Sequence, residues 1–581
     1  MLRLYQHFCR NCQLGKQLFI LAVVKLLCLG GLRELPIQLK AFFYFFASFF
    51  VLALYSCSSE EGSGGKERAN GRVFRYNQAS GISSLDPAFA KDQATMWAVN
   101  QLFNGLVQTD EQLNVRPCIA HTWDISPDGL VYTFKLRSDV FFHDHELFEG
   151  GKGTKVTAQD VLYSLNRLID PAVASTGAWL FNGKLAAQEP FKVLNDSTFQ
   201  LRLQQAFAPM LGILSMQYCS IVPKTIVEHY GKEFRQHPVG TGPFQFKLWK
   251  ENEALILSAN PHYFETNAAG KRLPLIDGVK VSFVENKRNE FLLFQEGKLD
   301  LLSGLDATYK DELLSAEGQL LERWNDKAYL LRAPYLNTEY FGFLMQNNAN
   351  KALENRFLRQ AINYGFDRLK MLRYLRNNIG VAATQGFVPP ALPPFNGKHR
   401  TKGYDYNPAK TAELLKKAGF EGGKNLPPIV LETNTTYQEM AIFVQNALAE
   451  SGIKIEIQLN QPALLREKAA KGQVSFFRAS WIGDYPDAET YLAVLYGKNT
   501  APPNYTRFKN SQYDALYEQS LTIKDDAARA RLYAQMDSLL IEEAPIVPLY
   551  YDEVLRFVRK GVDNLGINSI NLLTLKEVEL P

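Results

Sequence analysis

Residues 428–480 read PIVLETNTTYQEMAIFVQNALAESGIKIEIQLNQPALLREKAAKGQVSFFRAS, and their hydrophobic pattern decides the class of fold. Three segments have the composition of strands: 428–434, 453–459 and 473–480. Two segments between them have the pattern of helices: 435–451 and 462–471. We expect Thr435 or Thr436 to cap the first helix, while Gly452 and Gly472 follow the two helices as stop signals. This β-α-β-α-β order predicts a parallel sheet with helical crossovers.

The loop after the third strand is the candidate binding segment. Ligands of parallel α/β sheets bind beyond the carboxyl ends of the strands, and here that position holds WIGDYPDAETYL, residues 481–492. Asp487 and Glu489 fit the start of a short helix, as N-cap and first-turn acid. Asp484 precedes that helix among large apolar residues, where an unpaired carboxylate is costly. It therefore needs a cation, either a protein lysine or arginine or a charge on a ligand.

The N-terminal part of the chain differs from the rest. An apolar run over residues 41–57 ends in LYSC and is followed by a polar, glycine-rich stretch. It resembles a bacterial lipoprotein signal, which implies a signal peptide over 1–56, lipid on Cys57 and a flexible tether over 57–71. The alternative is an uncleaved membrane anchor, but the run is shorter than the roughly 20 apolar residues that a spanning helix needs. Residues 1–36 are consistent with an over-extended gene start.

The charge of the remaining chain disfavours nucleic acid as a partner. Residues 1–56 hold six of the 64 basic and one of the 60 acidic residues, so residues 57–581 carry a net charge of −1 in place of +4. Nucleic-acid binding needs a basic footprint, and that surplus lies in the leader. The length left is too great for one hydrophobic core and indicates about three domains.

Cysteine usage leaves one question open. Of six cysteines, three lie in the leader and Cys57 is the lipidation candidate, so Cys118 and Cys219 remain. They form either one disulfide, which an oxidising compartment would allow, or two buried thiols.

Other motifs give no strong site. FFHDHE offers His143 and His145, but no third metal ligand lies nearby, and the loop 481–492 lacks the alternating acids and glycine of an EF-hand. EGGKGTK (149–155) does not have the residue order of a Walker loop, and PVGTGPF (238–244) is better explained as a tight chain crossing than as a dinucleotide turn. We expect no metal and no cofactor.

A family resemblance covers residues 72–560 and depends on motifs in a fixed order. The stretch VRPCIAHTWDISPDGLVYTFKLRSDVFFHDHELF, with KVTAQDVLYSLNRL after it, resembles the signature of the peptide/nickel class of ABC-transporter solute-binding proteins. The further matches are HPVGTGPF, NPHYF, EGKLDL, NRFLRQAINYGFDRLKML and YNPAKTAELLKKAGF. Two departures are His145, where the family has glycine, and the insertion of 149–155.

The resemblance implies an α/β fold of the periplasmic-binding-protein type, with two hinged lobes, an extra domain and a ligand between the lobes. The expected domains are lobe I over 72–118, 233–330 and 548–581, the extra domain over 119–232, and lobe II over 331–547.

Residue roles follow from the same resemblance. Asp484 matches an aspartate that holds the α-ammonium of a bound peptide, and Arg478, six residues earlier, matches an arginine that meets a ligand carboxylate. A second peptide-facing edge follows the first strand, here SGISSLDP (80–87). The predicted ligand-binding residues are Asp484, Arg478, Ser480, Trp481, Ile482, Tyr485 and Ser83.

The function that these expectations describe is a receptor without enzymatic activity. It would capture oligopeptides or dipeptides and deliver them to ABC permease and ATPase subunits, as a monomer attached by lipid to a membrane of the cell envelope and facing the periplasm or exterior. The alternatives are a receptor for nickel complexes or oligosaccharides and, from another class, a hydrolase that uses paired carboxylates.

Overall fold

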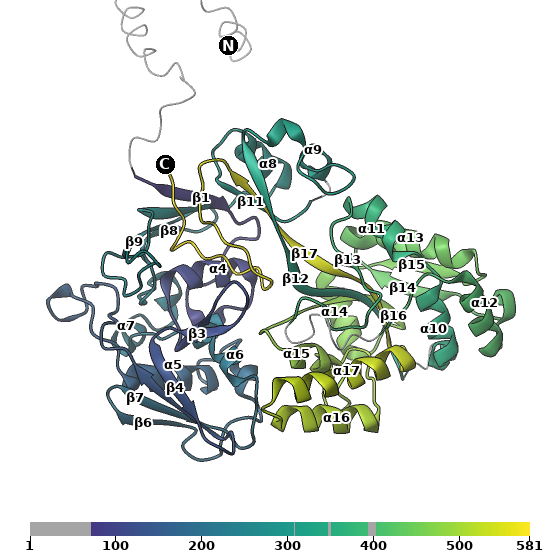
Figure 1. Cartoon of the computed structure of the whole chain (residues 1–581), viewed down its shortest axis with the longest axis horizontal. Coiled ribbons are helices and arrows are strands. Elements are labelled where there is room, and N and C mark those ends of the chain that lie inside the picture. The colour runs from purple at the N-terminus through teal and green to yellow at the C-terminus, as the bar shows by residue number, and fades with distance from the viewer. Residues whose placement is uncertain (1–70, 307, 347–349, 393–401) are drawn as a thin grey trace, which may run out of the picture. The chain divides into compact units, whose positions relative to one another are not determined.

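A long mixed sheet organises the second half of the chain (Figure 1). The computed structural model describes residues 71–306, 308–346, 350–392 and 402–581. The strands of this sheet run in the order β11-β17-β12-β16-β14-β15, with β13 beside β17. Their bounds are β11 Leu301–Ser303, β12 Ala328–Phe343, β13 Val381–Ala382, β14 Ile429–Thr433, β15 Ile455–Leu459, β16 Phe476–Ile482 and β17 Ile546–Arg559.

The predicted β-α-β-α-β unit is confirmed. Strand β14 lies between β15 and β16 and is parallel to both, with α13 (Gln438–Ala449) and α14 (Pro462–Lys471) as crossovers. The predicted threonine cap is wrong, because Asn434 accepts the Thr436 N–H at 3.0 Å and a 3₁₀ turn precedes α13. Strand β16 also ends two residues later than predicted, since β12 pairs with it as far as Ile482.

Helices cover both faces of this sheet. They are α10 Arg356–Tyr364, α11 Arg368–Arg376, α12 Pro408–Lys417, α15 Glu489–Leu492, α16 Ser511–Thr522 and α17 Asp526–Glu543. Because successive strand residues point to opposite faces, Tyr340 and Phe341 of β12 enter two different cores. Phe341 packs with the cluster that includes Val444 of α13, and Tyr340 packs with the cluster that includes Met536 of α17.

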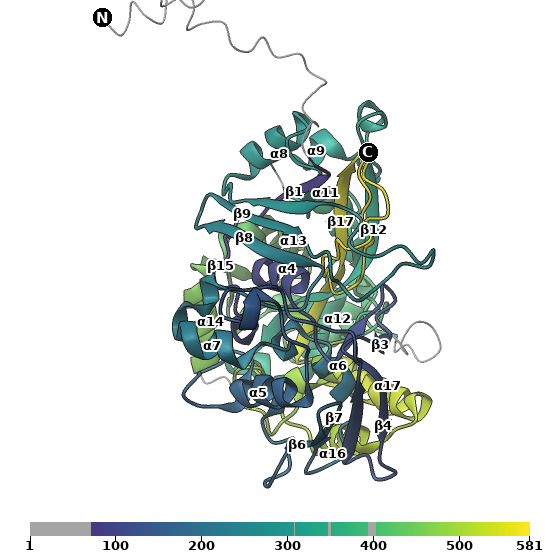
Figure 2. The same ribbon diagram turned by 90° about the vertical axis from the view of Figure 1, so that its left-hand side faces the viewer.

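Two smaller sheets form the first half of the described chain. One has the order β1-β10-β9-β8 and the other β4-β5-β7-β6, and a hairpin of β2 and β3 stands apart. The bounds are β1 Val73–Asn77, β2 Val107–Thr109, β3 Val115–Pro117, β4 Ala120–Ile125, β5 Val131–Leu136, β6 Phe191–Asn195, β7 Thr198–Arg202, β8 Phe244–Lys250, β9 Ala254–Ala259 and β10 Gly278–Ser282. Figure 2 shows β8 and β9 at one end of this half and β4, β6 and β7 at the other.

The helices of this half are α4 Gln93–Leu102, α5 Ala158–Ile169, α6 Met210–Leu214, α7 Lys224–Tyr230, α8 Lys287–Gln295 and α9 Lys310–Leu313. Four of them, α4 to α7, join the two smaller sheets in one hydrophobic core, while α8 and α9 pack in a separate cluster with Trp324. The core combines Phe74 of β1, Trp97 of α4, Phe134 of β5 and Leu165 of α5. None of the helices in the described segments is long and apolar enough to cross a membrane. The leader, Cys57 and nearly all of the tether lie outside the described residues.

The glycine-rich segment 238–244 is a tight chain crossing, as predicted. A Cβ on Gly242 would lie 2.4 Å from the carbonyl carbon of Leu102, at the end of α4. His143 is buried at this crossing, where its Nδ1 accepts the Gly240 N–H at 3.3 Å and its Nε2 donates to the Gly242 oxygen at 3.0 Å. Burial lowers the pKa of His143 to about 4, so the ring is neutral and part of the scaffold.

The cysteine question left open by the sequence is answered within the described ranges. Cys118 and Cys219 are buried free thiols, and burial raises the pKa of each to about 12. No group of three or more histidine, cysteine, aspartate or glutamate side chains there could hold a metal ion.

Strands β12 and β17 are the candidate hinge. They are the longest strands of the described chain, and their pairing changes register between Pro334 and Thr338. The predicted domain limits at 331 and 548 fall inside these two strands. A bend at an irregular two-stranded crossing is a common basis for hinge motion. The domain limits themselves stay a prediction.

Candidate ligand-binding site

Strand β16 has an open edge. On one side, β12 pairs with it from Phe476 through Ile482. On the other side, β14 pairs only with Phe476 and Phe477, because β14 ends at Thr433. In the described chain, no strand covers the second edge from Arg478 to Ile482.

The register shows which peptide groups face that edge. The Leu344 N–H donates to the Ser475 oxygen at 3.0 Å, and the Gly483 N–H donates to the Leu336 oxygen at 2.8 Å. The odd-numbered residues between these contacts therefore direct their N–H and C=O groups toward β12. Arg478, Ser480 and Ile482 direct theirs toward the open edge, where an extended ligand could add as a strand.

Asp484 lies two residues beyond β16. Its Oδ2 accepts the Thr490 hydroxyl at 3.0 Å, and the Trp481 indole N–H donates to the same hydroxyl at 3.3 Å. Burial is the main cause that raises the pKa of Asp484, to about 6, and the Glu489 charge adds to the rise. No lysine or arginine of the described segments forms an ion pair with it. The sequence allowed either a protein base or a ligand cation as the partner of Asp484, and the described residues provide no such base.

The other two acids of the loop have structural roles, as predicted, but the N-cap of α15 is Ala488 and not Asp487. Asp487 accepts the Glu489 N–H at 3.0 Å and the Tyr533 hydroxyl at 2.7 Å. Its second oxygen pairs with Arg529 of α17 at 2.9 Å. The Glu489 carboxylate accepts the hydroxyls of Tyr485 and Tyr517. These contacts fix α15 and the loop that precedes it, and the tyrosines could not be identified from sequence spacing.

The remaining predicted residues of the loop lie in different surroundings. Ile482 is 46% exposed, and Ser480 and Trp481 are half-buried, with Trp481 packed beside the core of Tyr340 and Met536. Tyr485 is buried, and its Cβ lies 3.4 Å from the position that a Cβ on Gly212 of α6 would take. Tyr485 is therefore a packing contact between the loop and α6.

Ser83 lies apart from this loop in the contacts that the structure shows. It is exposed and lines a different cavity of about 680 Å³, beside the buried ion pair of Asp86 and Arg167. Its role in ligand binding stays a prediction.

Arg478 already has an acidic partner. Its guanidinium pairs with Glu339 of β12, and the two side chains are only 13% and 3% exposed. The guanidinium also lies 3.4 Å from the centre of the Tyr437 ring. Sequence reasoning missed Glu339, because β12 precedes β16 by more than a hundred residues and no local pattern links them.

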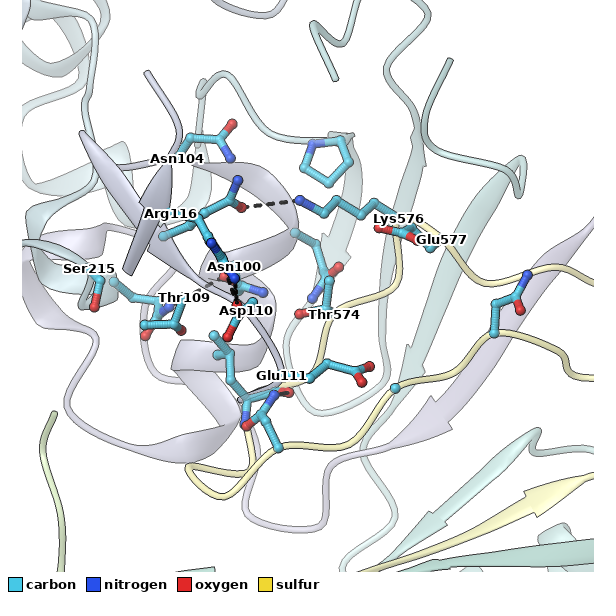
Figure 3. Close-up of a pocket in the computed structure, with 18 of the residues that line it drawn as sticks. Asn100, Asn104, Thr109, Asp110, Glu111, Arg116, Ser215, Thr574, Lys576 and Glu577 are labelled. Carbon is cyan, nitrogen blue, oxygen red and sulfur yellow. Dashed lines mark hydrogen bonds and ion pairs between the residues drawn. The ribbon is translucent and has the colours of Figure 1, made fainter. Parts of the chain in front are cut away.

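Figure 3 shows a polar cavity of about 440 Å³ between α4, the β2–β3 hairpin and the C-terminal segment. Its charged groups include Arg116, which pairs with Asp110 at 2.7 Å, and Lys576, which pairs with Glu265. None of the predicted site residues lines it.

The environment of Asp484 predicts an unusual effect on stability. The unfolded pKa is near the ordinary 3.8 and the folded value is about 6, so the folded protein binds this proton more tightly. Ionisation therefore lowers the free energy of unfolding as pH rises from about 4 to about 6, by about 3 kcal/mol in total. We expect Asp484→Asn to stabilise the ligand-free protein at pH 8 by up to that amount, and to lose the gain below about pH 4. Urea unfolding of both proteins, at pH 8 and below about pH 4, measures this difference in the free energy of unfolding.

The matched control is Asp487→Asn, which removes the buried one of the two carboxylates that pair with Arg529 and should destabilise the protein at pH 8. A loss of stability in Asp484→Asn at pH 8 would show that a protein base holds this carboxylate.

Comparison with known proteins places this geometry in a family. The chain is 27% identical to the glutathione-binding protein GsiB of Escherichia coli O6:K15:H31 over 509 residues, covering 86% of this chain and 93% of the relative. Among solved structures, it resembles the periplasmic binding protein DppA of Helicobacter pylori in complex with the peptide STSA. That likeness has a TM-score of 0.71 and 25% identity, and covers 87% of this chain and 98% of the other.

A second solved structure, HbpA2 of Haemophilus parasuis, has a TM-score of 0.75 and 23% identity, and covers 88% of this chain and 100% of that one. These likenesses confirm the predicted fold class of two α/β lobes with an extra domain. The family model for bacterial extracellular solute-binding proteins, family 5, matches residues 114–503. The chain therefore belongs to the bacterial extracellular solute-binding proteins of family 5.

Proposed function

We propose that this chain is the substrate-binding receptor of an ABC importer and that it binds peptides through Asp484. The observation that carries the proposal is a half-buried carboxylate without a described protein base, two residues beyond an open strand edge. The similarity to DppA, solved with a bound peptide, and to a glutathione-binding protein supports a peptide-like ligand.

The two features of the site match the two constant features of a peptide. Its N-terminal ammonium supplies the positive charge that Asp484 lacks, and a charge-assisted hydrogen bond is strong in a site shielded from water. Its backbone can pair with the peptide groups of Arg478, Ser480 and Ile482 along the open edge. Neither interaction depends on the side chains of the ligand. Thr490, held by Trp481, orients the carboxylate.

Ligand entry requires the two sides of the site to separate. Lys524, in the turn between α16 and α17, donates to the Ser126 oxygen at 3.1 Å, and the Ala208 N–H donates to the Leu521 oxygen at 3.4 Å. Together with the packing of Tyr485 on Gly212, these contacts join the part that carries Asp484 to the part that carries the β4–β7 sheet. A bend at β12 and β17 would open them.

Peptide binding can be tested with a two-by-two titration. Wild type and Asp484→Asn are titrated by calorimetry with a free and an N-acetylated peptide. Removing one partner of a buried charge pair costs about 2–5 kcal/mol, which is roughly 30-fold to several thousandfold in affinity. Either change alone should cost this much, and the two together should cost little more, because both delete one interaction.

Additive losses would remove Asp484 from the site. Mass spectrometry of the titrated peptide separates the rivals, because a receptor returns it intact while a hydrolase returns fragments. Binding of nickel complexes or oligosaccharides in place of every peptide would contradict the proposal.

Closure of the lobes should be visible in solution. Saturation with a tightly bound peptide is expected to reduce the radius of gyration, measured by small-angle X-ray scattering on protein stripped of co-purified ligand. An unchanged radius at saturation would argue against a hinged receptor. Asp484→Asn at the same peptide concentration is the control and should stay open.

The proposal includes anchoring of a monomer at the membrane surface through lipid on Cys57, facing the periplasm or exterior, where it would meet permease and ATPase subunits. It rests on the LYSC sequence and the polar tether behind it. Cys57→Ser is expected to abolish lipid labelling and leave either soluble protein or unprocessed precursor, which fractionation and immunoblotting distinguish. Ser58→Ala is the control and should be labelled normally. Lipid labelling of the Cys57→Ser protein would disprove the assignment.

A further inference from the structure

The charges around Arg478 form a closed set on one face of the long sheet. Arg478 pairs with Glu339, and Arg376 of α11 pairs with Asp552 of β17 at 2.5 Å. The Asn337 amide connects the two carboxylates, donating to Glu339 at 3.1 Å and to Asp552 at 3.5 Å. Two positive and two negative groups thus cancel within the protein.

A ligand carboxylate would disturb this balance. To pair with the terminal nitrogen of Arg478 that Glu339 holds, it would have to displace Glu339, whose side chain is 3% exposed and cannot turn into solvent without opening the cluster. Removing the partner of a buried charge leaves that charge uncompensated, which is strongly unfavourable. Asp484 differs, since no described base neutralises it. Among the described residues, Asp484 and the buried Glu489, which accepts two tyrosine hydroxyls, have no ion-pair partner, and both are negative.

Among the described side chains, one donor and one acceptor are left without partners beside Glu339. Within the described residues, Arg478 Nε and Asn337 Oδ1 are buried without a hydrogen-bond partner. One is a donor and the other an acceptor, and each side chain binds a different oxygen of Glu339. A carboxylate offers acceptors only, whereas an amide offers both kinds of group.

We propose that the ion pair with Glu339 occupies Arg478, so that the site does not hold a ligand carboxylate there. The site then selects ligands by their ammonium group and by neutral amides. This inference rests on the proposed peptide-binding function and specifies its ligand class. The class is peptides whose carboxyl end lies beyond this cluster or is itself an amide.

The test compares alanine peptides of two to five residues, each as free acid and as C-terminal carboxamide, by calorimetry at pH 8. If Arg478 held the carboxylate, the amide would lose about 30-fold or more in affinity. We expect wild type to bind the two forms within about threefold at each length that binds. Glu339→Gln keeps the shape and frees Arg478, so the acid should gain about tenfold or more over the amide at the length that reaches it.

Two variants act as controls. Glu553→Gln removes the carboxylate of β17 that pairs with Arg332 of β12 and should leave the acid-to-amide ratio unchanged. Arg478→Gln in the presence of Glu339 should also leave the ratio unchanged, which keeps the inference testable if Glu339→Gln does not fold.

A wild-type preference for the acid of about tenfold or more that Arg478→Gln removes would overturn the inference and leave peptide binding intact. A ratio in folded Glu339→Gln that stays at the wild-type value for every length would also overturn it. Failure of every peptide to bind wild type would refute the proposed function and this inference together.

Discussion

The pairing of β12 with its two neighbours is the constraint on which the candidate site depends. On one side, β12 aligns β16 so that the peptide groups of Arg478, Ser480 and Ile482 face the open edge. On the other side, its irregular pairing with β17 makes the candidate hinge. The same strand carries Glu339 and Asn337 into the charge cluster. A shift of β12 by one residue would turn those side chains to the opposite face of the sheet and would exchange the peptide groups at the edge.

Electrostatics divides the site into two unequal parts. Around Arg478 the protein supplies both signs of charge, and such a buried pair contributes less to net stability than to fixing the arrangement of its members. At Asp484 the protein supplies one sign, and a hydroxyl is the side-chain donor that it provides. Burial without a counter-charge is costly, so this carboxylate is explained more readily by a ligand than by the fold. The contrast between the two parts, only six residues apart in sequence, gives the site its polarity.

The sequence predicted those features of the fold that depend on residues close together in the chain. The β-α-β-α-β unit followed from hydrophobic periodicity, and the chain crossing at Gly242 from glycines that permit close backbone approach. Helix patterns placed Glu489 correctly in the first turn of α15, but they assigned the N-cap to Asp487 where the structure has Ala488. The threonine cap was wrong because Asn434, one residue earlier, is an equally good acceptor, and the tertiary fold decides between such neighbours. The Arg478–Glu339 pair could not be predicted, since strand order brings together residues that are distant in sequence. For the same reason, sequence could propose Asp484 but could not show that no described base lies beside it.

The unmatched charge also couples binding to stability. A ligand that binds only the folded protein stabilises it in proportion to the logarithm of its concentration over its dissociation constant, and a cationic ligand at Asp484 additionally relieves the cost of the ionised carboxylate. That relief is available only when the ammonium is enclosed, because water weakens the attraction between two charges. Gly212 of α6 packs against Tyr485 in the loop of Asp484, and the turn before β5 contacts Lys524 between α16 and α17. The carboxylate therefore binds a cation more strongly in the closed conformation than in the open one. This difference in affinity favours closure of a hinged receptor when the ligand binds.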